Sequence, residues 1–262
     1  MRITRSVTAW VALAIGIELH AQSSPVRIAS RAVLEAASVK KSQQNVGGEI
    51  AIQPGGRILM TNVRVRDFVN MVYSADPPLL TQQIVGLPAW ASVVRYDIEA
   101  KFSTDGSDNT FDGRRGVGPY VRSLLEERFA FKAHLEKREL PVYLLTVTDS
   151  SKLRPSSMDC SGQENQPPCR GDYGPGHFDG QAVLISTMIS ELGRATERPV
   201  LDRTGLQGRF ELHLEWNPNP LDAADARPTI FGVLAEHGLK LEPARDVTEV
   251  LVIDHIERAA PD

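Results

Sequence analysis

Gly56-Arg-Ile-Leu-Met-Thr-Asn-Val-Arg-Val-Arg-Asp-Phe-Val69 decides the fold, because a second stretch of the chain repeats its plan. The second stretch reads Phe178-Asp-Gly-Gln-Ala-Val-Leu-Ile-Ser-Thr-Met-Ile-Ser-Glu-Leu192. Each has a short extended segment, a valine (Val63 or Val183), and then apolar residues at the spacing of an amphipathic helix. An internal repeat sets the architecture of a chain. We therefore predict two copies of one small module.

Two further pairs of segments extend the repeat. Residues 95–100 match residues 209–214, and residues 124–131 match residues 234–241 with a slip of one position. Short strands and short loops favour small mixed sheets with helices packed on one face. The predicted fold is α+β, with two tandem copies of a β-α-β-β/α-β-β module. The copies should superpose with Tyr96 on Phe210.

Three local details complete the prediction. Thr61-Asn62 is expected to cap the first helix. Residues 129–135 and 140–147 are expected to form a hairpin whose turn is the charged stretch 136–139. The chain is expected to close with a second hairpin of residues 239–241 and 249–256.

The N-terminus has the features of a secretory signal peptide. Arg2 and Arg5 precede an apolar run from Val7 to Ile17, and Ala21 offers a small residue for cleavage. The run is shorter than the roughly 20 apolar residues that span a bilayer. The alternatives are a membrane anchor or a buried helix. The predicted organisation is a signal peptide at 1–21, a first module at 22–150, a linker at 151–176 and a second module at 177–262.

Export makes a simple prediction about the mature protein. Its N-terminus should lie near Gln22, because loop-forming residues follow Ala21. Mass spectrometry of secreted or periplasmic material measures this directly. An intact Met1 on protein isolated from cells would contradict it.

The charge of the chain limits its partners. The formal net charge is −4, and no run of Lys or Arg reverses that sign locally. A mildly acidic surface argues against nonspecific binding to nucleic acid or to an anionic membrane. After signal cleavage we expect no stable membrane span. A partner in the envelope is expected instead, such as another protein or a peptide bound through an edge strand.

Cys160 and Cys169 flank a polar stretch with neither helical nor strand periodicity. In an oxidising compartment two cysteines this close are a disulfide candidate. A metal pair and a redox couple are the alternatives. Metal is disfavoured because the nearest histidine, His177, lacks a partner at ligand spacing.

The search for chemistry finds no catalytic set. No Gly-x-Ser-x-Gly elbow and no His-Glu-x-x-His motif occurs, so no catalytic residue, metal ligand or cofactor is assigned. His134 and His255 lie on predicted strands, and Asp254-His255 could pair with a serine that folding brings near. Trp90 and Trp216 flank turns and are weak candidates for a binding face together with His255, although packing explains such tryptophans as well.

Eight ordered segments resemble an exported bacterial family of unknown function that is expanded in Acidobacteria. They are residues 37–40, 55–63, 83–90, 96–100, 125–129, 138–143, 198–206 and 250–254. The resemblance covers almost the whole mature chain and implies no catalytic residue. Similar domains also occur fused behind membrane-bound sensor peptidases of the beta-lactam-response type. The β-α-β-β pattern is also similar to the short N-terminal domains of secretins and TonB-dependent transporters.

Three functions remain as hypotheses. The first is an exported, non-catalytic binding or interaction protein of the cell envelope. The second is an envelope hydrolase that uses His134 or His255 with a Ser or Asp. The third is a ligand-sensing domain linked to a membrane sensor peptidase. A concave pocket with convergent polar groups would help to choose among them.

Overall fold

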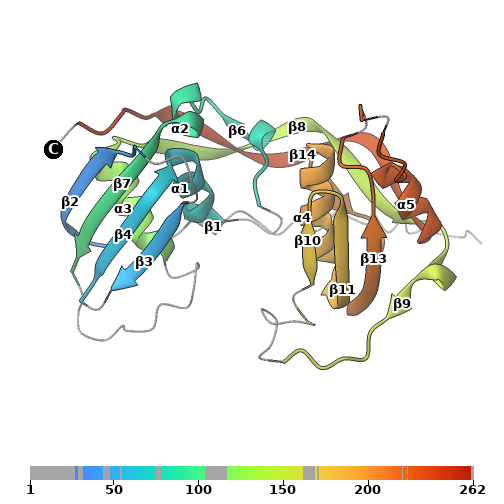
Figure 1. Cartoon of the computed structure of the whole chain (residues 1–262). Helices are drawn as coiled ribbons and strands as arrows, with labels where there is room; N and C mark the ends of the chain where they lie inside the picture. The colour runs from blue at the N-terminus through green and yellow to red at the C-terminus, as the bar shows by residue number, and fades with distance from the viewer. Residues whose placement is uncertain are drawn as a thin grey trace, which may run out of the picture.

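The computed structural model describes residues 27–28, 32–43, 48–53, 55–74, 78–103, 117–161, 169, 171–219, 221–222 and 224–260. These residues form helices together with antiparallel and mixed sheets, which confirms the α+β class. The predicted signal peptide lies outside the described residues. Two groups of elements lie side by side, and a long ribbon of two strands joins them (Figure 1).

The first outer sheet is antiparallel and has the strand order β2-β7-β4-β3. Its strands are β2 (Leu34–Lys41), β3 (Glu49–Gln53), β4 (Arg57–Arg64) and β7 (Arg95–Phe102). The accompanying helices are α1 (Val65–Val72), α2 (Ala89–Val93) and α3 (Gly118–Arg128). Alternate β7 side chains, from Tyr96 to Phe102, are buried in one core with the apolar face of α1. The i, i+3, i+4, i+7 spacing predicted for α1 is confirmed, because Val65, Phe68, Val69 and Val72 are all buried.

The second outer sheet is also antiparallel, in the order β10-β11-β13-β9. Its strands are β9 (Arg154–Pro155), β10 (Asp172–Gly174), β11 (His177–Leu184) and β13 (Arg209–Glu215). The helices of this half are α4 (Ile185–Thr196) and α5 (Ile230–Glu236). A pair of two-residue strands, β1 (Arg27–Ile28) and β5 (Tyr73–Ser74), completes the outer elements.

The two outer sheets share their order and their irregularities. Val63 lies opposite Tyr96 directly after a bulge, and Val183 lies opposite Phe210 directly after a bulge. In both sheets an arginine at the start of the central strand donates to the carbonyl within that bulge: Arg95 to Asn62 at 2.9 Å and Arg209 to Ala182 at 3.0 Å. The shared strand order, bulge and arginine contact are consistent with the predicted duplication of one module. The superposition itself stays a prediction.

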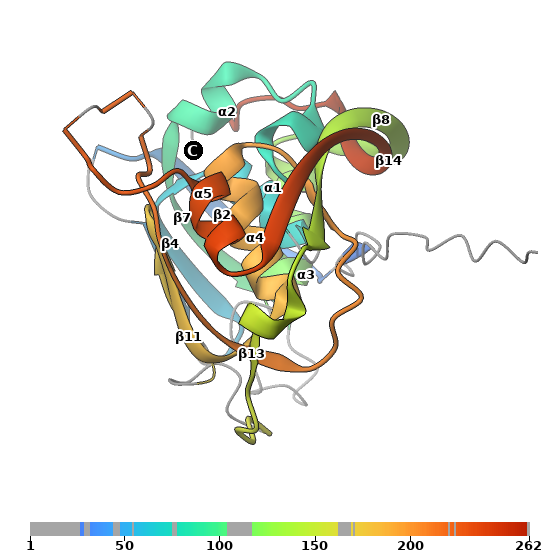
Figure 2. The ribbon, with the colours of Figure 1, turned by 90° about the vertical axis from the view of Figure 1, so that its right-hand side faces the viewer.

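The ribbon between the halves consists of β8 (Lys132–Val147) and β14 (Leu239–His255), paired antiparallel along nearly their whole length. Two short strands extend it in parallel. β6 (Ile84–Val85) belongs to the first half and pairs with β14, whereas β12 (Val200–Asp202) belongs to the second half and pairs with β8. A short strand of each half therefore pairs with the last long strand of the other half: β6 with β14, and β12 with β8. Figure 2 shows the two long strands twisting around each other.

The two predicted terminal hairpins are wrong, because β8 and β14 each run without a turn. The charged stretch 136–139 pairs in register with residues 247–250 instead of reversing the chain. Polar residues suit this position because the ribbon passes between the two cores. Across it, the Arg245 guanidinium lies 2.5 Å from the Glu139 carboxylate.

The two cores do not divide at residue 150. The first core includes Leu251 and Ile253 from the end of β14, and the second includes Leu145 from β8. Leu251 and Leu145 have no exposed surface. Each core is therefore completed by the other half of the chain.

The predicted cap of the first helix is also wrong. Arg64 occupies the N-cap position of α1, and Asp67 accepts from its backbone N–H at 3.3 Å and from its guanidinium at 2.9 Å. Asn62 lies two residues earlier, in the bulge of β4, with a positive φ of 55°. Asparagine tolerates that conformation better than most residues. Asn62, predicted as a helix cap, therefore forms part of the β-bulge instead.

Candidate functional site

The two tryptophan candidates lie in different environments. Trp216 is only 5 % exposed and belongs to the second core. Trp90 lies on α2, half-buried against the first core, with the Arg258 guanidinium 5.6 Å from its ring centre. The two rings therefore do not form one binding face.

Both histidine candidates have carboxylate partners on the surface. His134 Nδ1 lies 2.9 Å from Asp254 Oδ2, and His255 Nε2 lies 2.9 Å from Glu257 Oε1. Within the described residues no serine or threonine hydroxyl hydrogen-bonds with either imidazole. A Ser-His-Asp arrangement is not assembled in that part of the chain. The same residues contain no group of three or more His, Cys, Asp or Glu able to hold a metal ion.

A half-open cavity of about 330 Å³ lies where β2 ends, β7 begins and the tail after β14 returns to the first half. Its described lining residues are Val39, Lys40, Lys41, Val94, Tyr96, Arg258 and Ala259. None of these carries a carboxylate. Ligand sites commonly occupy about 300–1,000 Å³ and combine apolar walls with a few polar groups. The cavity has the composition and the size of a small ligand site.

Tyr96 gives the cavity a hydrogen-bonding group without a partner. The side chain is 5 % exposed, and its ring stacks edge-on against Phe129 at 5.3 Å. No described group hydrogen-bonds with its hydroxyl. Burial raises the pKa of Tyr96, and the nearby Arg258 cation opposes part of that rise. Because Tyr96 lines the cavity, its hydroxyl is available to a ligand there.

The two lysines at the end of β2 differ in direction. Lys41 lies opposite Tyr96 in the register, and Lys40 lies opposite Asp97. Successive side chains of a strand point to opposite faces of the sheet. Lys41 therefore lies on the same face of the sheet as Tyr96, and Lys40 lies on the opposite face. Neither Lys41 nor Arg258 forms an ion pair with any described carboxylate.

The corresponding position in the second half lacks the tyrosine hydroxyl and the lysine ammonium. Phe210 lies opposite Pro155 there, in the register positions that Tyr96 and Lys41 occupy in the first half. The backbone is the same, because Ser156 donates to Arg209 as Ser42 donates to Arg95, both at 2.8 Å. Only the first half combines the hydroxyl with the ammonium at this position.

Comparison with known protein families matches residues 66–256 to a family described as "Protein of unknown function (DUF3738)". The chain belongs to this family. The match confirms the predicted resemblance to a family of unknown function. No curated protein and no solved structure matches the chain. Within the DUF3738 match lie Val94 and Tyr96 of the cavity, whereas Lys41 and Arg258 lie outside it.

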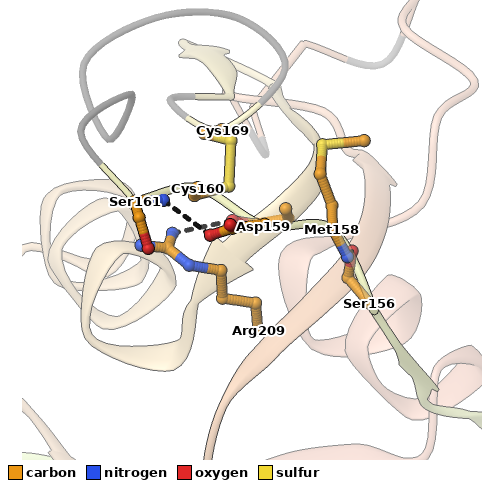
Figure 3. The surroundings of a disulfide bond; sticks show 8 residues. Ser156, Met158, Asp159, Cys160, Ser161, Cys169 and Arg209 are labelled. Atoms are coloured by element: carbon orange, nitrogen blue, oxygen red, sulfur yellow. Dashed lines mark hydrogen bonds between the residues drawn. A yellow bond between two sulfur atoms is a disulfide. The ribbon is translucent and has the colours of Figure 1, made fainter.

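Cys160 and Cys169 form a disulfide with a Cα–Cα distance of 5.7 Å, which confirms the predicted pairing (Figure 3). Both cysteines lie outside strands and helices, but they are buried against Ala182 of β11. In Figure 3 the Arg209 side chain lies beside Asp159, next to the bridge. The DUF3738 match includes this bridge. It anchors the linker to the bulge of the second sheet.

Reduction of the bridge should lower the free energy of unfolding by at most about 2–3 kcal/mol, because the loop that it closes is short. Both cores should stay folded, since neither includes a cysteine. Denaturant unfolding with and without reductant, monitored by Trp216 fluorescence, measures the change. A Cys160→Ala/Cys169→Ala variant serves as the control for reductant effects. Two free thiols in exported protein would contradict the bond itself.

Sequence reasoning missed the cavity of this DUF3738 protein because its groups come from three distant segments. Lys41 ends one strand, Tyr96 begins another, and Arg258 follows the last strand. One signal was present in the repeat: Tyr96 matches Phe210, so a hydroxyl distinguishes the two copies at a buried position.

Proposed function

We propose that this protein is an exported, non-catalytic binding protein of the cell envelope whose ligand occupies the cavity of the first half. One observation carries the proposal: the hydroxyl of the 5 % exposed Tyr96 and two cations that pair with no described carboxylate line one cavity. Unpaired polar groups at a concave apolar surface are a general sign of a ligand site. Export is supported by the N-terminal pattern and by the disulfide, which persists in oxidising compartments.

The ligand-sensing hypothesis is a form of the same proposal. A sensor needs a binding cavity, and in the described part of the chain no helix is long and apolar enough to cross a membrane. Signalling would therefore pass to a separate membrane protein. Two further expectations from the sequence stay proposals. One is the likeness to the N-terminal domains of secretins and TonB-dependent transporters, and the other is the expansion of the family in Acidobacteria.

An envelope partner has a place to bind. The β2 edge is occupied in part, because the Arg128 guanidinium donates to the Ala37 carbonyl. The opposite edge, β3, pairs only with β4 among the described strands. A peptide could add to that edge by β-augmentation.

A hydrolase is the second candidate, favoured by the 2.9 Å contact between His134 and Asp254. Such a pair can orient an imidazole as a general base. Both side chains are about half exposed, and in the described residues the imidazole contacts no nucleophile.

The experiment that tests the proposal compares binding with turnover. The mature Trp216→Phe variant keeps Trp90, beside Arg258, as a fluorescent reporter. It is titrated with three aromatic probes of one size: phenylacetate, 2-phenylethanol and 2-phenylethylamine. Saturable binding of any one, weakened by Val94→Phe in the cavity wall, supports a binding function. No binding, together with 4-nitrophenyl acetate hydrolysis that His134→Ala abolishes, would establish the hydrolase instead.

A further inference from the structure

The cavity has a charged end and an apolar end. Lys41, Arg258 and the Tyr96 hydroxyl supply donors, whereas Val39, Val94 and Ala259 supply apolar surface. All three polar groups can donate hydrogen bonds, and two of them carry positive charge. A guanidinium and an ammonium together suit the oxygen atoms of a carboxylate or a phosphate.

The size of the cavity limits the ligand. A volume of about 330 Å³ equals that of about eleven water molecules at about 30 Å³ each. This is enough for one small organic acid, or for the end group of a larger molecule that extends through the open side. Lys41 and Arg258 are both exposed residues, so water solvates them when the cavity is empty. An oxyanion adds charge-assisted hydrogen bonds that a neutral ligand cannot make, and a cationic ligand would be repelled.

From these observations we propose that the cavity binds one amphipathic oxyanion per chain, with its carboxylate or phosphate between Lys41, Arg258 and Tyr96 and its apolar part against Val39 and Val94. The inference rests on the proposed binding function and specifies its ligand class. One site per chain follows because Phe210 and Pro155 replace Tyr96 and Lys41 in the second half. The oxyanion would draw the Arg258 guanidinium away from the Trp90 ring.

The test uses the mature full-length chain and isothermal titration calorimetry at 0.15 M salt. Phenylacetate and phenyl phosphate represent the two sources of an oxyanion, and 2-phenylethanol is the neutral control. We expect at least one anion to bind at a ratio of one per chain, about tenfold or more tightly than the alcohol. Whichever anion binds more tightly identifies the preferred head group.

Four variants locate the anion. Lys41→Gln and Arg258→Gln should each weaken binding about tenfold or more, because each removes a charged hydrogen bond. Tyr96→Phe should weaken it about threefold to tenfold, and the fold accepts phenylalanine at the equivalent position 210. Lys137→Gln is the matched control: it removes the same charge from an exposed residue of β8 that is not among the residues lining the cavity. It should change the Kd by less than about twofold, since salt screens exposed charges over about 8 Å.

The outcomes separate this inference from the function on which it rests. Equal binding of the alcohol and the anions, or equal effects of Lys137→Gln and Lys41→Gln, would overturn the ligand class and leave a binding protein. Two anions per chain would overturn the single site. Absence of binding by every probe, with folding verified by circular dichroism, would overturn both proposals.

Discussion

Cut at residue 150, the two halves of the chain should each fail to fold alone. The fragment 22–150 lacks Leu251 and Ile253 of the first core and leaves β8 without its partner strand. The fragment 151–262 lacks Leu145 of the second core and exposes β14 in the same way. Circular dichroism and NMR dispersion of each fragment, separately and mixed, measure this. The mixture should recover native signals, because the ribbon can form between two chains.

Point variants make the same prediction quantitative. Leu251→Ala and Leu145→Ala should each lower the free energy of unfolding by about 2–5 kcal/mol, the usual range for a fully buried leucine. Val247→Ala is the matched control on β14, since its side chain is 58 % exposed, and it should cost less than about 0.5 kcal/mol. A well-dispersed NMR spectrum from either fragment alone would show that the halves are independent domains.

Gly238→Ala should destabilise the protein by about 2–5 kcal/mol. Gly238 follows α5 with a φ of +73°, where an L side chain costs roughly 1–2 kcal/mol. An added Cβ would also lie 2.1 Å from the carbonyl oxygen of Asp149, so the backbone must move. Overpacking of this kind costs about 1–3 kcal/mol. The displaced segment carries the amides of Thr148 and Asp149, which both donate to the Gly238 carbonyl.

A second glycine separates conformational strain from the steric clash. Gly205 has a φ of +68°, and an added Cβ would meet nothing within 4 Å. Gly205→Ala should therefore cost only the strain of positive φ, about 1–2 kcal/mol. Urea unfolding of the two variants measures the difference. Equal losses in both would mean that the contact with Asp149 relaxes without cost.

Local elements of the fold could be predicted where periodicity and burial agree. The helix of Val65, Phe68, Val69 and Val72 is an example, since its apolar residues recur at helical spacing and are all buried in the first core. The paired cysteines are another, because chain proximity alone brings them together. In both cases the relevant neighbours lie close in sequence.

The ribbon could not be predicted because its strands pair across a separation of about a hundred residues. Residues 136–139 resemble a turn by composition, and only the opposite strand makes them a strand. Pro141 and Pro243 also lie within the ribbon. The cavity could not be predicted for the same reason, since Lys41 and Arg258 come to line one cavity only after both halves have formed.

The exchange of strands between the halves also sets an order of events during synthesis. The first core cannot be completed until Leu251 and Ile253 have been synthesised, after all the strands and helices of the second half that precede them. Until then the apolar residues of the first half lack these two core neighbours. If the N-terminal segment directs export, as proposed, this delay in completing the first core would keep the chain unfolded enough to pass through a narrow translocation channel. The binding cavity would then come into existence only on the far side of the membrane, when the tail that carries Arg258 arrives.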